Sequence, residues 1–122
     1  MWKATAFIPV VVMASAAVAG SATITDAGAK NMGSSAAYVA TCEKEQLVKS
    51  GTLADLLGDL QEGLRPSHWD KVKKQYQLSL HDRRQYSIAQ NEWIPFRVNR
   101  ENCADLAKAL PLIKTSLRRH AK

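Results

Sequence analysis

The stretch NRENCADLAKALPLIKTSLRRH (residues 99–120) decides how the rest of the sequence is interpreted. Its apolar side chains recur every three or four residues, the spacing of one helix face; they are Cys103, Leu106, Leu110, Ile113 and Leu117. Asn99 is a suitable N-cap, and Pro111 is expected to kink the helix. We therefore predict an amphipathic C-terminal helix that carries one of the chain's two cysteines in its first turn.

The first residues have the three parts of a secretory signal peptide. Lys3 gives a short positive region, residues 4–13 form an uncharged apolar core, and the sequence AVA ending at Ala19 fits a cleavage site. An uncleaved membrane anchor is the alternative, because no charge occurs between Lys3 and Asp26. We expect residues 1–19 to be removed and the protein to be periplasmic or secreted.

Export predicts that the two cysteines form a disulfide, because thiols in an oxidising compartment are usually oxidised in pairs. A Cys42–Cys103 disulfide would close a loop of about 60 residues, which the chain-entropy model values at roughly 4 kcal/mol. Two unpaired buried thiols are the alternative. Two cysteines alone do not make a zinc site, and we predict neither a metal nor a cofactor.

The length of 122 residues allows one domain. The formal net charge is +6, and removal of Lys3 with the signal peptide leaves about +5. This basic excess favours an anionic partner, such as a membrane surface, a cell-wall polymer, nucleic acid or an acidic protein, but it also fits a role in solubility.

A segment without periodicity and then several short periodic segments follow the signal peptide. Residues 20–35 are small and polar without periodicity, and we interpret them as a flexible leader. The domain would then occupy residues 36–122, beginning with helices at 36–49 and 52–63. Another helical turn starts at Ser67.

The apolar period changes from helical to strand-like after Tyr76. Alternation continues through three segments within residues 76–98, which favours a small antiparallel β-meander. Pro95 cannot donate to a ladder, so the last strand is expected at an edge. The predicted class is α+β, with two short N-terminal helices, the meander and the C-terminal helix. An all-α bundle is the alternative, because good helix formers occur through residues 67–90.

Few side chains offer catalytic chemistry. His81 next to Asp82 resembles part of a metal site, but further ligands are not evident in the sequence, and a turn explains it more simply. The remaining candidates also have structural explanations; they are His68, His120 and the carboxylate pairs Glu43/Glu45 and Asp55/Asp59. The sequence has no nucleophile elbow and no phosphate-binding loop. We therefore predict that the protein is not an enzyme.

The candidate binding residues combine basic charge with one aromatic side chain. Basic residues crowd the centre of the sequence: Lys71, Lys73, Lys74, Arg83 and Arg84. If the apolar residues of the last strand face the core, Trp93 and Arg97 face outward together, and tryptophan beside arginine is typical of binding hot spots. The alternatives are that Trp93 packs under the first helix and that the basic run is a solvated face.

These features indicate an exported protein that acts by binding. A secreted or envelope protein is the expected partner, as for an inhibitor, an immunity protein or an accessory subunit of an envelope complex. A cell-wall or membrane-surface binder that uses the basic face is the second interpretation, and a small hydrolase or toxin is the third. Nucleic acid is not expected, because no recognition motif is present.

Overall fold

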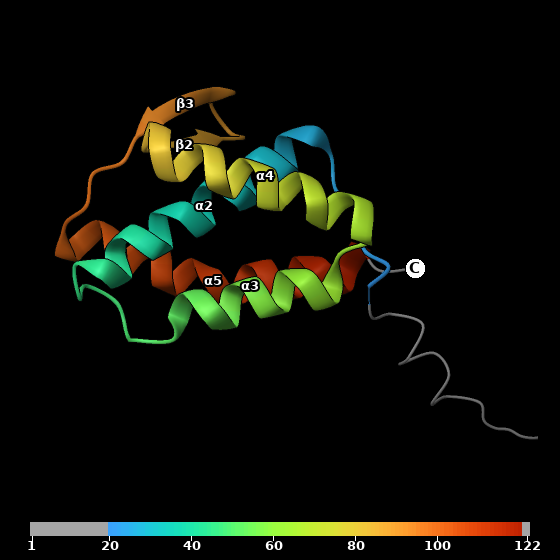
Figure 1. Cartoon of the computed structure of the whole chain (residues 1–122), viewed down its shortest axis with the longest axis horizontal. Coiled ribbons are helices and arrows are strands. Elements are labelled where there is room, and N and C mark those ends of the chain that lie inside the picture. The colour runs from blue at the N-terminus through green and yellow to red at the C-terminus, as the bar shows by residue number, and fades with distance from the viewer. Residues whose placement is uncertain (1–19, 121–122) are drawn as a thin grey trace, which may run out of the picture.

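Four helices and one hairpin follow one another in the described part of the chain, residues 20–120 of a computed structural model (Figure 1). Their bounds are α2 (Asp26–Lys44), α3 (Thr52–Gly63), α4 (Pro66–Asp82), β2 (Arg84–Ser87), β3 (Glu92–Pro95) and α5 (Arg100–His120). This mostly helical arrangement is consistent with the predicted small α+β class. The expected signal peptide at residues 1–19 lies outside the described residues.

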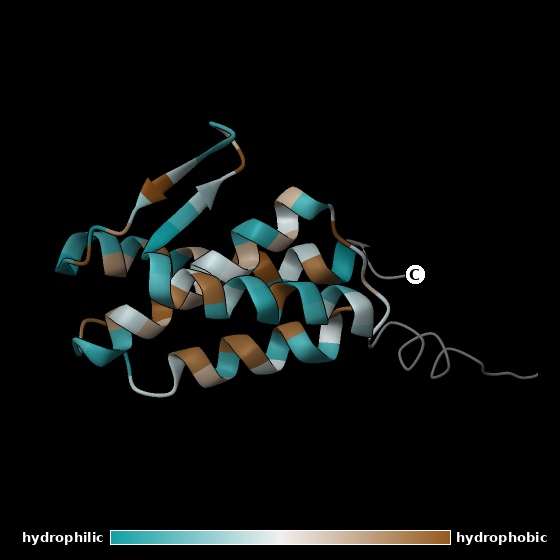
Figure 2. Cartoon of the chain, turned by 45° about the horizontal axis from the view of Figure 1, so that its top comes forward, coloured by the Kyte–Doolittle hydropathy of each residue, from teal (hydrophilic) through white to brown (hydrophobic). Residues whose placement is uncertain are grey.

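Helix α2 is the central element. It packs against α4, against the hairpin strand β2, and against α3 and α5. In Figure 1, α3 and α5 lie side by side beneath α2 and α4. Figure 2 shows that the hairpin projects from the helices and is coloured mostly hydrophilic.

The N-terminal half of α2 corrects the prediction of a flexible leader at residues 20–35. Ten of those residues, 26–35, are helical, and Thr25 caps the helix by accepting a 3.0 Å hydrogen bond from the Gly28 amide. Small residues are typical of a flexible segment, but here they permit close packing. A Cβ atom built on Gly33 would lie only 2.6 Å from Gln75 Cβ and 2.7 Å from the Val72 carbonyl oxygen of α4.

Serines complete this contact between α2 and its neighbours. Ser34 is fully buried; its hydroxyl donates to the Lys30 carbonyl at 2.6 Å and accepts from the Tyr86 amide at 2.9 Å. Ser35 Oγ accepts from the Gln85 side chain at 2.8 Å. Buried hydroxyls therefore hold β2 against α2 with hydrogen bonds that a larger apolar side chain would remove.

The predicted three-stranded meander is wrong in its first strand, because residues 76–80 belong to helix α4. The alternation there does not reflect burial, since Leu78 and Leu80 are 50% and 38% exposed. The helix instead buries Val72 and Ser79. Tyr76 also packs on the core, and burial, with a smaller contribution from the Glu43 carboxylate, raises the pKa of its phenol.

The other two predicted strands form an antiparallel hairpin. Residues Arg84, Gln85, Tyr86 and Ser87 pair in order with Pro95, Ile94, Trp93 and Glu92. Arg83 links the hairpin to α4 in a left-handed conformation with φ 56°, and its carbonyl accepts from the Phe96 amide at 2.9 Å. Pro95 ends the edge strand β3, as expected for a residue without an N–H group.

Helix α5 confirms the predicted amphipathic helix and its cap. Asn99 Oδ1 accepts from the Asn102 amide at 2.8 Å. The predicted apolar stripe faces inward: Cys103 and Leu117 are buried, and the residues between them are partly buried against the core. Pro111 lies inside the helix.

The predicted Cys42–Cys103 disulfide is confirmed, with a Cα–Cα distance of 5.8 Å. Both cysteines are fully buried beside Tyr38, which stacks on Phe96 with 4.5 Å between ring centroids. The Tyr38 hydroxyl donates to the Arg97 carbonyl at 2.7 Å and accepts from the Arg97 amide at 3.2 Å. This cluster joins α2, the segment after the hairpin and the start of α5.

Candidate binding site

The catalytic candidates of the sequence lie apart or have structural contacts. His68 and His81 sit near opposite ends of α4, about 20 Å apart by the rise of a helix. Glu43 Oε1 accepts a 2.9 Å hydrogen bond from the Leu53 amide and so joins α2 to α3. Between residues 20 and 120, no three His, Cys, Asp or Glu residues are grouped to hold a metal ion.

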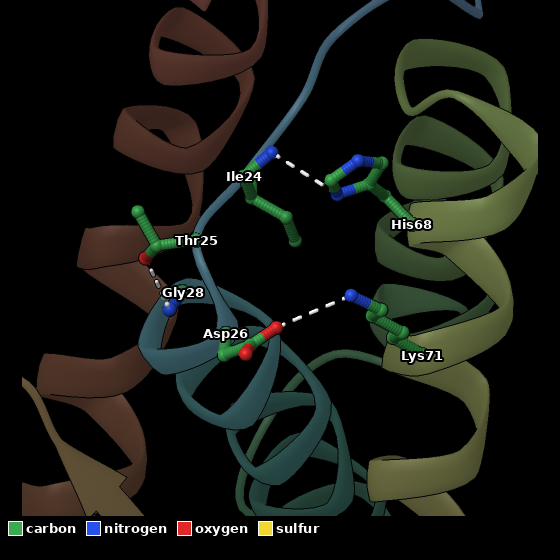
Figure 3. Close-up of polar contacts among 6 residues, drawn as sticks. All are labelled: Ile24, Thr25, Asp26, Gly28, His68 and Lys71. Carbon is green, nitrogen blue, oxygen red and sulfur yellow. Dashed lines mark hydrogen bonds and ion pairs between the residues drawn. The ribbon is translucent and has the colours of Figure 1, made fainter.

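His68 holds the segment that precedes α2. Its Nδ1 atom accepts a hydrogen bond from the Ile24 amide at 3.3 Å, and the Lys71 ammonium lies 3.2 Å from an Asp26 carboxylate oxygen (Figure 3). Just before, Ala22 donates to the Gly63 carbonyl at 2.9 Å and accepts from the Arg65 amide at 2.8 Å. These bonds give His68 a structural role in anchoring residues 20–25.

The lysines predicted to bind lie on two sides of α4. Lys71 and Lys74 border a shallow groove of about 300 Å³ between α2 and α4, to which α2 adds Lys30. Lys73 points elsewhere: it pairs with Asp70 at 3.4 Å and lies 5.6 Å from the Trp69 ring centroid. Lys30 was not among the predicted binding residues, because it lies within the expected leader at residues 20–35.

The predicted pair of Trp93 and Arg97 is not formed as a strand face, because β3 ends at Pro95 and the alternation stops there. Trp93 is half-buried and meets the Tyr86 ring edge-on with 5.1 Å between centroids. The Arg84 guanidinium lies 5.5 Å from the Trp93 ring centroid and 3.7 Å from Asp82. Trp93 is therefore grouped with Arg84, whereas Arg97 is fixed through its backbone by Tyr38.

An apolar groove of about 560 Å³ lies between the start of α2, the hairpin turn and the C-terminal half of α5. Its lining residues are Thr23, Ile24, Thr25, Gly28, Asn31, Met32, Ile88, Leu112, Ile113 and Ser116. Two of them are unusually exposed for large apolar side chains: Ile88 at 54% and Leu112 at 69%. We refer to this feature as the apolar groove.

The apolar groove was not predicted from the sequence for two reasons. Ile88 falls within the alternating segment that predicts a strand, but it lies in the turn after β2. Leu112 does not belong to the stripe of α5, and that departure from the apolar period was the available signal.

No family model, curated protein or solved structure matches this chain. No helix within residues 20–120 has the length and hydropathy needed to cross a bilayer.

Proposed function

We propose that this chain is a small exported binding protein that acts through contact with another protein, and that the apolar groove receives the partner. The exposure of Ile88 and Leu112 on the border of that groove carries the proposal. Large apolar side chains grouped at one concave site lose a favourable burial energy while they face water. Such groups mark interaction sites more often than single exposed leucines do.

Export is supported by the disulfide, because such bonds persist in oxidising compartments. A partner in the envelope or outside the cell follows from that location. An inhibitor, an immunity protein or an accessory subunit of an envelope complex fits the size of the chain.

The test begins with a photoreactive amino acid at position 112 in the exported protein, followed by identification of the crosslinked partner. With the partner purified, Leu112→Glu should weaken binding at least tenfold, or about 1.4 kcal/mol, because it places a carboxylate in the apolar contact. Leu80→Glu is the matched control, since Leu80 is also exposed but lies on α4 outside the apolar groove.

Affinity at an apolar contact should also change little with salt, because screening acts mainly on exposed charges. Equal weakening by both substitutions, or no effect of Leu112→Glu on the purified complex, would exclude the apolar groove as the contact surface.

A further inference from the structure

The groove between α2 and α4 gathers three lysines from two helices. Lys30 comes from α2, and Lys71 and Lys74 lie one turn apart on α4. Leu78 continues the same side of α4 and also lines the groove. We refer to these four residues as the lysine groove. Close packing of α2 on α4 at Gly33 holds the two helices together beneath it.

The positive charge of the lysine groove is only partly balanced. Asp26 lies 3.2 Å from Lys71, but both side chains are largely exposed, at 83% and 57%, so the pair is solvated and weak. Lys30 lies 5.3 Å from the Tyr86 ring centroid. Within the described residues Lys74 has no ion-pair partner. The residues that line this groove thus contribute three ammonium groups and one carboxylate.

The net charge of the helices is also uneven. Helices α3 and α5 together contain five basic and five acidic residues, which cancel. Helices α2 and α4 with residues 83–98 contain eight basic and five acidic residues. The excess positive charge of the described chain therefore lies mainly on the side that carries the lysine groove.

The exposed leucine decides which anionic partner fits. A free phosphate or a soluble polyanion needs only the ammonium groups. Leu78, which lines the same groove, is 50% exposed. At a lipid surface, lysine ammonium groups reach the phosphates while an apolar side chain between them enters the acyl boundary.

We propose that the lysine groove docks the protein onto the surface of an anionic bilayer, with Lys30, Lys71 and Lys74 at the lipid phosphates and Leu78 inserted between the headgroups. The protein then lies on the membrane. This surface is separate from the apolar groove, so the docked protein would keep Ile88 and Leu112 available to a protein partner.

Sedimentation with vesicles tests the proposal on the exported, disulfide-bonded protein. Vesicles of phosphatidylglycerol and phosphatidylcholine in equal amounts should bind it, and vesicles of phosphatidylcholine alone should not. Lys30→Gln and Lys74→Gln should each lower the partition coefficient about fivefold, the effect of one basic residue near an anionic surface. Leu78→Ser should lower it several-fold without changing the net charge.

The matched control removes the same charge elsewhere. Lys108→Gln combined with Arg118→Gln alters two exposed positions on α5, neither of which lines the lysine groove. This variant should bind far better than Lys30→Gln combined with Lys74→Gln. Circular dichroism should show that all variants stay folded, because the substituted side chains are exposed.

Three results would overturn the proposal. The first is equal loss of vesicle binding in the two double variants, which would indicate attraction by net charge alone. The second is unchanged binding of Leu78→Ser, which would indicate a polyanion site without lipid insertion. The third is equal binding to both kinds of vesicle. None of these depends on Leu112, so failure here and failure of the apolar groove are separate outcomes.

Discussion

Gly33 is the residue on which the contact between α2 and α4 depends. An added Cβ would lie 2.7 Å from the Val72 carbonyl oxygen, a backbone atom that cannot turn aside, and 2.6 Å from Gln75 Cβ. Overpacking of this kind typically costs about 1–3 kcal/mol. We expect Gly33→Ala to lower the free energy of unfolding by about 2 kcal/mol in urea titrations, despite the better helix propensity of alanine.

Gly58 provides the control because it also lies within a helix but has no atom within 4 Å of an added Cβ. Gly58→Ala should raise the free energy of unfolding by about 0.5–1 kcal/mol. If the two substitutions changed stability in the same direction and by similar amounts, the close contact at Gly33 would not be the cause.

The roles of some single residues could be predicted from the sequence, and the role of Gly33 could not. Cys42, Cys103 and Asn99 were assigned correctly, because a disulfide and a helix cap follow from chemistry that is local or limited to two cysteines. The role of Gly33 depends on residues about 40 positions away in α4, so its neighbours in sequence contain no signal for it.

At the scale of elements, α3 and α5 were predictable and α4 was only half predictable. The apolar stripe of α5 has a clear helical period, and the structure buries it. In residues 76–80 the leucines alternate like a strand, but burial there selects Tyr76 and Ser79 instead. A buried serine gives no apolar signal, so the helical face of α4 could not be recognised. The apolar and lysine grooves were not predicted for a different reason: each includes residues from the first half of α2, which was expected to be a flexible leader.

The segment before α2 is anchored to α4 by a bond that requires neutral histidine. His68 Nδ1 accepts from the Ile24 amide at 3.3 Å (Figure 3), so the ring proton must be on Nε2. His68→Ala removes this acceptor and leaves the Ile24 amide without its partner. The protection factor of the Ile24 amide should therefore fall several-fold in hydrogen-exchange NMR.

Three comparisons make this measurement specific. In His68→Gln the side-chain oxygen can still accept the hydrogen bond, so the Ile24 amide should stay largely protected. His81→Ala should leave the Ile24 protection factor unchanged, because the His81 side chain is 92% exposed and pairs only with its neighbour Asp82. The Gly28 amide, bound to Thr25 Oγ1, should serve as an internal reference. An unchanged protection factor of Ile24 in His68→Ala would assign its protection to another contact.

At the scale of the whole molecule, the described residues form two buried clusters of unequal size. The larger one joins all four helices of the described chain. The smaller one has only three buried residues, Tyr38, Cys42 and Cys103, with Phe96 and Val98 packed against them. So few apolar contacts contribute little burial energy, and the disulfide is the main connection between α2 and the start of α5.

Removal of this disulfide should therefore weaken the molecule unevenly. It closes a loop with a sequence separation of 61 residues, for which the chain-entropy model gives roughly 4 kcal/mol. Cys42→Ala combined with Cys103→Ala should lower the free energy of unfolding by about that amount in urea. Hydrogen exchange should accelerate most near Cys103 and in residues 96–98, and least where α2 packs on α4, because Gly33 and Ser34 hold that contact independently. A loss below about 1 kcal/mol, with uniform exchange, would mean that packing alone keeps α5 on α2.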